Sequence, residues 1–270
     1  TRVLRGEDHI ANTPRQILLY EAFGFDVPTF GHVPLIHGKD KKKLSKRHGA
    51  RSTTEYRDEG ILPQALLNYL VRLGWAHGDQ EIFSREELVK LFTTEHLSRS
   101  AAAFDPEKLL WLNGQYIKEA AREKLGAMLK ELYAAKGLEA DSAFLAQVVP
   151  LYQPRAKTII EMAEGAEFFI RTADSLEYDD KAVEKFLTPE ARELLAEVRT
   201  LLNGLAPFDH DSLDQALRGL LEAKELKFKV LAQPLRVALT GKTFSPGIFE
   251  TLEVLGREES LARLDRTLAM

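Results

Sequence analysis

Apolar and polar positions follow a helical period over most of the chain. From Pro63 to the C-terminus, strand-like alternation is nearly absent and apolar residues recur at helical spacing. The segment that Pro63 opens and Gly74 closes is typical of an amphipathic helix. Its apolar residues fall largely on one side: Leu66, Leu67, Leu70, Val71 and Leu73. The pattern therefore predicts a mainly α fold.

Residues that favour helix starts divide this part of the chain into a series of elements. Ser84 with Glu87 forms a capping box, and Asp105 followed by Pro106 begins another helix. Beyond Tyr116 the pattern predicts helices over residues 116–135, 141–153, 155–172, 180–186, 189–202, 211–222, 224–239, 246–255 and 258–268. The sequence contains no internal repeat and no low-complexity tract.

The first residues of the chain show an α/β pattern instead. Val3-Leu4 is interpreted as the end of a buried strand, and a helix follows from about Pro14 to Phe23. Thr13 can cap this helix and Gln16 can close a capping box, while Gly24 ends the helix. A buried strand needs neighbouring strands, which the downstream sequence does not obviously supply. We therefore expect part of this α/β domain to lie upstream of the sequence.

A short apolar run and a basic loop follow this unit. Val33-Pro34-Leu35-Ile36 is interpreted as a strand that leads into a mobile loop between Gly38 and Gly49. The segment from Lys39 to Arg47 holds six basic residues and one acid, a local charge of +5. Because the whole chain carries −4, the remainder carries −9. One loop therefore concentrates the positive charge.

The composition excludes several classes of protein. With 270 residues, 44% of them apolar, the chain can bury a sizeable core and divide into two or three domains. Zero cysteines exclude disulfides and thiolate metal sites, and the seven histidines show no HExxH-like spacing, so we expect no zinc and no other bound metal. No apolar run is long enough for a membrane span, and the N-terminus does not resemble a secretory signal. These features predict a cytoplasmic protein without membrane contacts.

The basic loop contains the residues with the clearest chemistry. In Lys43-Leu44-Ser45-Lys46-Arg47, two ammonium groups three residues apart can converge on one polyanion, and the flanking glycines permit movement. When ATP activates a carboxylate, negative charge builds on the departing pyrophosphate, and a lysine that approaches in the transition state lowers the barrier. The alternative for so short a motif is a solvated basic run or a non-specific RNA patch.

Several motifs resemble one enzyme family in order and content. VLRGEDH at residues 3–9, NTPRQ at 12–16, LLYEAFG at 18–24 and KLSKRHG at 43–49 are similar to the second half of the class I catalytic domain of bacterial glutamyl-tRNA synthetases. In that family KLSKR is a form of the KMSKS signature. The resemblance continues downstream through Tyr56-Arg57-Asp58, residues 66–70, Leu73-Gly74-Trp75, Phe104-Asp105, Lys108-Leu109, Trp111-Leu112-Asn113, Leu235-Arg236, residues 238–241 and Ser245-Pro246.

The resemblance assigns roles to residues near the N-terminus. Arg5 matches the arginine that pairs with the carboxylate of the substrate glutamate; the alternative is a salt bridge to Glu7. Asp8, Ile36 and Lys46 match ATP-binding positions, as a polar anchor, a backbone contact to adenine and the phosphate-binding lysine.

Plainer roles are open for some of these residues. Asp8 could instead cap a turn, Ile36 could be ordinary core, and His9 fits a structural histidine better than a nucleotide contact. Together with Lys43 and Ser45, Lys46 forms the catalytic set that the resemblance implies.

The family's ATP site also needs a HIGH-type segment, and no His-x-Gly-His-like sequence occurs in the chain. We therefore expect an enzyme whose intact form is a glutamate-tRNA ligase, while this fragment alone does not activate glutamate. The expected domains are residues 1–37 from the Rossmann-like catalytic domain, 38–120 with the KLSKR loop and the stem-contact region, and two helical anticodon-binding domains at 121–175 and 176–270.

The helical second half distinguishes this family from its relatives. Glutaminyl-tRNA synthetases end in β-barrels, and the short tRNA-modifying relatives lack this half. Arg155 and Lys157 could contact phosphates or bases of the anticodon arm at an exposed helix start; the alternative for both is a solvated helix start without a ligand. The implied partners are tRNA(Glu), L-glutamate and ATP with Mg²⁺, bound to a monomer.

Three functional hypotheses follow from these observations. The first is the ATP-dependent ligase, the second is a non-catalytic tRNA-binding helical module, and the third is a helical scaffold whose basic loop is incidental. Preference for cognate tRNA across a salt series separates the third hypothesis from the other two.

Overall fold

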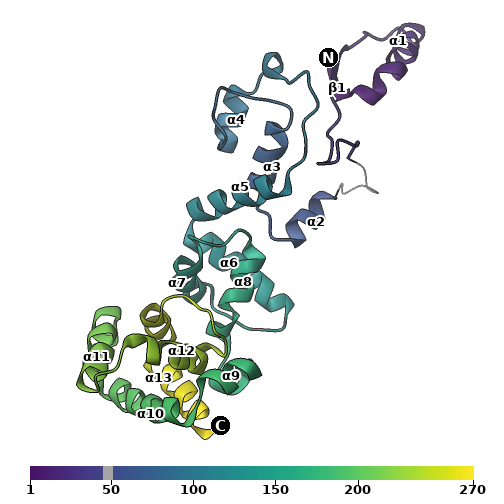
Figure 1. Ribbon diagram of the computed structural model, residues 1–270. Helices are drawn as coiled ribbons and strands as arrows, with labels where there is room; N and C mark the ends of the chain where they lie inside the picture. The colour runs from purple at the N-terminus through teal and green to yellow at the C-terminus, as the bar shows by residue number, and fades with distance from the viewer. Residues whose placement is uncertain (45–50) are drawn as a thin grey trace. The chain divides into compact units, whose positions relative to one another are not determined.

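The computed structural model describes residues 1–44 and 51–270, which form two compact units, Thr1–Glu119 and Ala120–Met270 (Figure 1). The mainly α fold predicted from the sequence is confirmed. Within the described residues, none of the helices combines the length and the apolar character that crossing a membrane requires. The finer division at residues 37/38 and 175/176 stays a prediction.

The chain begins with a strand–helix–strand unit. Strand β1 (Arg2–Gly6) leads through a 3₁₀ helix, η1 (Glu7–Asn12), into α1 (Thr13–Ala22), and β2 (Thr29–Val33) then pairs with β1 in parallel. The register places Arg5 opposite His32. A parallel pair joined by a helix is the α/β pattern that the sequence predicts.

Two details of this unit differ from the predictions. The second strand ends at Val33, so a strand over residues 33–36 was wrong; Pro34 follows β2 and has no N–H for a ladder. Leu4 is 48% exposed, so β1 is less buried than expected. The two-stranded sheet offers few apolar groups to cover its faces.

The start of α1 also differs from the prediction. Its N-cap is Asn12, without a side-chain cap, so the capping box of Thr13 and Gln16 was wrong. The Thr13 hydroxyl donates to the carbonyl of His9 and accepts a hydrogen bond from Arg5, which also donates to Gln16. Both side chains therefore bind Arg5 and do not cap the start of the helix.

Helices make up the rest of the first unit: α2 (Thr53–Asp58), α3 (Pro63–Arg72), α4 (Arg85–Leu91), η2 (Thr94–His96) and α5 (Pro106–Glu119). The helix starts predicted at Ser84 and Asp105-Pro106 are confirmed, the first with both bonds of its capping box. Helix α2 was missed, although Ser52 and Glu55 form a capping box of the same kind.

Two fully buried asparagines connect the helices of this unit. Asn68 on α3 accepts hydrogen bonds from the Phe83 amide at 2.7 Å and from the Tyr116 hydroxyl at 3.0 Å. Asn113 on α5 accepts from the Leu62 amide at 2.8 Å and donates to the Gly60 carbonyl at 3.2 Å. Buried amides of this kind satisfy loop backbone groups that would otherwise lack partners.

The buried face of α3 is therefore not the predicted one. The helix buries Ala65, Leu66, Asn68 and Tyr69, whereas Leu67 and Leu70 are each 43% exposed.

The second unit consists of helices: α6 (Arg122–Ala135), α7 (Ser142–Tyr152), α8 (Ile159–Ala166), η3 (Glu167–Ile170), η4 (Ala173–Ser175), α9 (Asp180–Phe186), α10 (Pro189–Gly204), α11 (His210–Ala223), α12 (Phe228–Thr240) and α13 (Ile248–Ala269). Leucines and valines of α10 to α13 build one hydrophobic core of this unit. The predicted elements over 141–153, 180–186, 189–202 and 211–222 are confirmed to within two residues.

Three predicted helices in the second half need correction. A single helix over 116–135 was wrong, because the chain leaves the helix at Ala120–Ala121 between α5 and α6. The helix predicted from residue 155 starts at Ile159, and the one predicted from 224 starts at Phe228. By contrast, the predicted break between the C-terminal helices 246–255 and 258–268 is confirmed, because α13 consists of two helical stretches that meet at the non-helical Gly256.

Candidate functional site

Arg5 occupies a half-buried place near the carboxyl end of β1. Its guanidinium donates to Gln16 Oε1 at 2.6 Å, to Thr13 Oγ1 at 2.7 Å and to His32 Nε2 at 3.3 Å. The Phe30 ring lies 4.9 Å below the guanidinium carbon, a cation–π contact. Residues of β1, α1 and β2 together fix this cation.

The alternative pairing of Arg5 with Glu7 was wrong. Glu7 instead accepts a hydrogen bond from the Leu35 amide at 3.3 Å. Among the residues that the structure describes, no carboxylate forms an ion pair with Arg5, and its polar partners carry no negative charge. A half-buried guanidinium without a counter-ion is suited to bind a carboxylate of a ligand.

Asp8 and Lys43 meet beyond the end of β1. The Lys43 ammonium lies 2.9 Å from Asp8 Oδ2, and this hydrogen bond holds the pKa of Asp8 below its usual value. Both side chains are about half exposed. The first lysine of KLSKR therefore lies beside the residue that the sequence assigned to the ATP site.

Residues 36–38 and the first residues of KLSKR are joined by backbone hydrogen bonds in a tight turn. The Leu44 amide donates to the carbonyl of Ile36 at 2.9 Å, and the Gly38 amide donates to that of Lys42 at 2.9 Å. Ile36 is half-buried, and its backbone contact with adenine stays a prediction. Ser45 and Lys46 lie outside the described residues, so their predicted roles are not placed.

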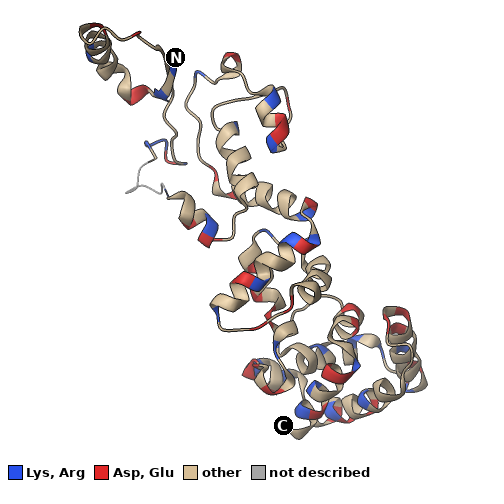
Figure 2. Cartoon of the chain, turned by 180° about the vertical axis from the view of Figure 1, so that it is seen from behind, with Lys and Arg blue, Asp and Glu red and all other residues tan. Residues whose placement is uncertain are grey.

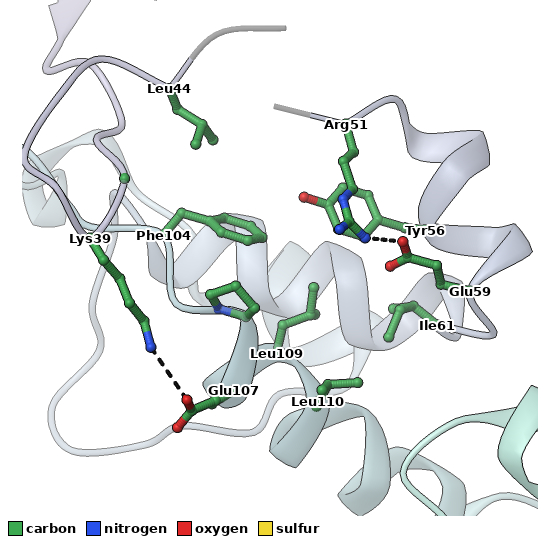
Figure 3. A pocket seen from close by; sticks show the side chains of 12 residues that line it. Lys39, Leu44, Arg51, Tyr56, Glu59, Ile61, Phe104, Glu107, Leu109 and Leu110 are labelled. Atoms are coloured by element: carbon green, nitrogen blue, oxygen red, sulfur yellow. Dashed lines mark hydrogen bonds and ion pairs between the residues drawn. The ribbon is translucent and has the colours of Figure 1, made fainter. Parts of the chain in front are cut away.

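A cavity of about 500 Å³ lies within the first unit, next to this turn (Figure 3). Its floor is apolar, with Tyr56, Ile61, Phe104 and Leu109, and Lys39 stands at its rim. Lys39 lies 3.2 Å from Asp105 and 3.5 Å from Glu107, and these acids raise its pKa.

Leu44 and Arg51 both border this cavity. They are the described residues on either side of positions 45–50.

Arg155 and Lys157 lie in the second unit and are exposed. They precede α8 rather than open it: the Arg155 amide donates to the Tyr152 carbonyl, and the Lys157 amide donates to Glu161. The helix itself is capped by Thr158, which accepts from the Glu161 amide at 3.0 Å. Figure 2 shows basic and acidic residues interspersed along the helices of this unit. Anticodon contacts by Arg155 and Lys157 stay a prediction.

A second polar surface of this unit was not assigned from the sequence. Arg236 donates to Ser245 Oγ at 3.0 Å, and burial lowers its pKa. Phe244, the residue before Ser245, is 68% exposed, and the Lys242 ammonium nitrogen lies 6.0 Å from the centre of its ring. Exposed rings next to cations suit the stacking of single-stranded bases. The sequence signal for this surface is the pair of motifs Leu235-Arg236 and Ser245-Pro246, which carry the family resemblance but have no predicted role.

The described residues contain no cluster of three or more histidine, cysteine, aspartate or glutamate side chains that could hold a metal ion.

Comparison with known proteins identifies both halves of the chain. Residues 1–111 match the family described as tRNA synthetases class I (E and Q), catalytic domain, and residues 115–268 match the anticodon binding domain. The glutamate–tRNA ligase of Nitratidesulfovibrio vulgaris strain Hildenborough is 52% identical over 270 residues, which are 100% of this chain and 58% of that protein. The ligase of Geobacter sulfurreducens is 50% identical over the same coverage.

Solved structures agree with this result. The glutamate tRNA ligase from Elizabethkingia meningosepticum, in complex with its amino acid, superposes with a TM-score of 0.85 at 29% identity, over 100% of this chain and 57% of that one. Glutamate-tRNA synthetase from Elizabethkingia anophelis gives a TM-score of 0.80 at the same identity and coverage. The chain spans about 58% of the length of the curated relatives it matches. The chain belongs to the glutamyl-tRNA synthetase family, and it carries part of the class I catalytic domain together with the anticodon-binding domain.

Proposed function

We propose that the protein carrying this chain is a glutamate–tRNA ligase. A carboxylate oxygen of glutamate attacks the α-phosphorus of ATP, and pyrophosphate leaves. A terminal hydroxyl of tRNA(Glu) then attacks the acyl carbon of the resulting adenylate, and AMP leaves as the glutamyl ester forms. The observation that supports this most directly is Arg5, a half-buried cation whose polar partners carry no negative charge, near the carboxyl end of two parallel strands. In open α/β sheets, ligands bind outside the carboxyl ends of the strands.

Each residue has a defined part in this proposal. Arg5 pairs with a carboxylate of glutamate. ATP enters with Mg²⁺ as part of the substrate, and Asp8 and the backbone at Ile36 hold the nucleotide. Lys46, with Lys43 and Ser45, approaches the phosphates as negative charge develops on the leaving pyrophosphate.

We expect Lys43 to change its ion-pair partner when ATP binds. Its present partner is Asp8, so binding of phosphates would replace an exposed ion pair with a triphosphate contact.

Lys46→Ala in the whole protein tests the catalytic part of the proposal. Because this charge acts mainly on the transition state, we expect glutamate-dependent ATP–pyrophosphate exchange to fall about a hundredfold, the scale of one lost electrostatic donor. The affinity for tRNA should change little. Lys181→Ala, at an exposed position of α9, is the matched control. Unchanged exchange in Lys46→Ala contradicts the assigned role.

The helical second unit is proposed to bind the anticodon arm of tRNA(Glu). Arg155 and Lys157 would contact phosphates or bases, and Phe244 beside Lys242 offers a ring for stacking. Binding of this chain to tRNA(Glu) and to an unrelated tRNA, measured across a salt series, tests this role. Equal binding of both tRNAs at every salt concentration rules out anticodon recognition.

The alternative is a tRNA-binding module without catalysis. The exchange assay on the whole protein separates the two, because a binding module has no glutamate-dependent activity. As a ligase of translation, the protein would act in the cytoplasm, and we propose that it does so as a monomer.

A further inference from the structure

The hydrogen-bond partners of Arg5 are a distinctive feature of the first unit. We propose that Gln16 and Thr13 are positioning residues for Arg5, and that their neutrality reserves the charge of the guanidinium for the substrate carboxylate. The inference rests on the proposed function of Arg5. It adds residues of α1 that do not themselves touch the substrate but decide how strongly Arg5 binds it.

The local fold places these side chains around one guanidinium. Thr13 and Gln16 are three residues apart in the first turn of α1, so their side chains lie on the same face of the helix. His32 lies directly opposite Arg5 in the parallel pair. Phe30 is two residues before His32 and therefore on the same face of β2, where its ring covers one side of the guanidinium.

The hydrogen bonds fix the orientation of Arg5 without saturating it. One bond is made by Nε, one by Nη1 and one by Nη2, and each terminal nitrogen keeps a further N–H. His32 Nε2 lies 3.3 Å from Arg5 Nε and 3.1 Å from the Thr13 hydroxyl oxygen. The remaining donors lie in one plane, as a carboxylate requires.

Other arginines of the chain differ from Arg5 because they have a carboxylate of the protein as a partner. Several pair with a carboxylate at hydrogen-bond distance: Arg72 with Glu81, Arg171 with Glu167, Arg218 with Asp214 and Arg263 with Glu259. In each case the protein supplies the counter-ion. At Arg5 the closest equivalent is the amide oxygen of Gln16, at 2.6 Å, which accepts a hydrogen bond but brings no charge. A carboxylate at position 16 would compete with the substrate.

Two substitutions at position 16 separate positioning from simple structural support. Gln16→Leu removes the acceptor, and we expect the KM for glutamate to rise about tenfold, the scale of one hydrogen bond to a charged group. Gln16→Glu keeps an acceptor at the same place but adds a charge. It should leave the thermal midpoint unchanged or raised, yet increase the KM for glutamate about a hundredfold, because the added carboxylate pairs with Arg5 and repels the carboxylate of the substrate. The KM for ATP should stay within twofold of the wild type, as an approximate bound.

A purely structural role for Gln16 predicts the opposite order. Gln16→Glu would then be the milder change, since the hydrogen bond to Arg5 persists. Equal or smaller effects of Gln16→Glu on the KM for glutamate therefore overturn the proposal. Gln215→Glu, the same change at an exposed position of α11, is the matched control.

A further variant carries the test if Gln16→Glu does not fold. Thr13→Val removes another neutral acceptor of Arg5 and should raise the KM for glutamate with little change in the KM for ATP. An unchanged KM for glutamate in Thr13→Val overturns the proposal in that case. All assays use glutamate-dependent ATP–pyrophosphate exchange by the whole protein in the presence of tRNA(Glu). If the wild type shows no exchange, the proposed function fails; if it is active and the variants behave as the structural role predicts, only this inference fails.

Discussion

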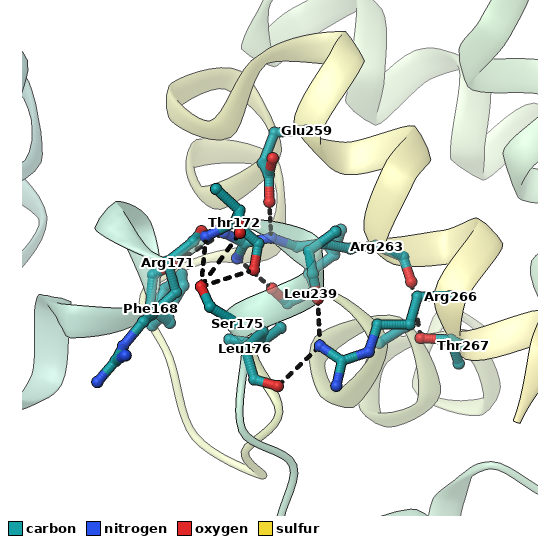
Figure 4. A network of polar contacts seen from close by, with 12 residues as sticks. Phe168, Arg171, Thr172, Ser175, Leu176, Leu239, Glu259, Arg263, Arg266 and Thr267 are labelled. Atoms are coloured by element: carbon teal, nitrogen blue, oxygen red, sulfur yellow. Dashed lines mark hydrogen bonds and ion pairs between the residues drawn. The ribbon is translucent and has the colours of Figure 1, made fainter.

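Arg263 is the polar side chain of the second unit whose loss should cost most. It is fully buried on α13 (Figure 4). Its guanidinium donates to the carbonyls of Leu239 at 2.6 Å, Phe168 at 2.8 Å and Arg171 at 2.5 Å, and to Glu259 Oε1 at 2.7 Å. The C-terminal helix is thereby joined to the end of α12 and to the segment after α8. Arg263→Leu removes all of these bonds while keeping an apolar stem.

The magnitude follows from what the substitution leaves behind. The carbonyls lose their donor inside the protein, whereas Glu259, whose side chain is 30% exposed, can regain water. The carbonyl losses are partly offset by the apolar surface of leucine, so we expect a destabilisation of about 4 kcal/mol. For a unit of this size, that corresponds to a fall of about 12 °C in the thermal midpoint.

Circular dichroism at helical wavelengths measures this fall, and fluorescence locates it. Both tryptophans, Trp75 and Trp111, lie in the first unit, so their fluorescence should report a transition that Arg263→Leu does not move. Arg199→Leu is the control, because it breaks an exposed ion pair with Asp265 and should leave the midpoint nearly unchanged. If Arg263→Leu melts within a few degrees of the wild type, the carbonyl contacts do not stabilise the unit as argued.

Two further predictions concern the same unit. Gly241→Ala should destabilise it by about 3 kcal/mol in chemical denaturation, because Gly241 has a φ of 71° and an added Cβ would lie 2.0 Å from the Glu177 carbonyl oxygen; a change below the error of the fit would contradict this. Burial opposes ionisation of Glu167, but hydrogen bonds from Arg171 and Lys136 outweigh it and hold its pKa below the usual value. A carboxyl group with a lowered pKa stabilises the folded chain at pH values above its pKa in the unfolded chain. This stabilisation is lost as the pH falls through its pKa in the folded chain. Glu167→Gln should therefore destabilise the chain at neutral pH, and the difference should vanish in acid; a difference that is independent of pH refutes the assignment.

Helix starts could be predicted from the sequence because a few neighbouring residues determine them. Ser84 with Glu87 needs only its own turn to satisfy the free amides at the helix end, and both bonds are present. The starts at Pro106, Asp180 and Pro189 follow the same logic. Ser52 with Glu55 carries an equal local signal for the start of α2.

Which face of a helix is buried could not be predicted in the same way. Leu67 and Leu70 of α3 are exposed, while Asn68 is fully buried. The reason lies far away in the sequence, because Asn68 binds Phe83 and Tyr116, which are 15 and 48 residues distant. Apolar periodicity cannot predict that an amide side chain is buried. Its burial is favourable only with hydrogen-bond partners, and the tertiary fold supplies these.

The wrong capping box at α1 is informative about the site itself. Thr13 and Gln16 satisfy the local rule for a helix start, yet the structure leaves the N-terminus of α1 without a side-chain cap. A cap of this kind is worth about 1 kcal/mol, so its absence has a local cost. Both side chains bind Arg5 instead, at 2.7 and 2.6 Å. Local rules are broken mainly at functional sites. The uncapped helix start and the guanidinium without a counter-ion thus point to one requirement, an arginine held in place with its charge available to a ligand.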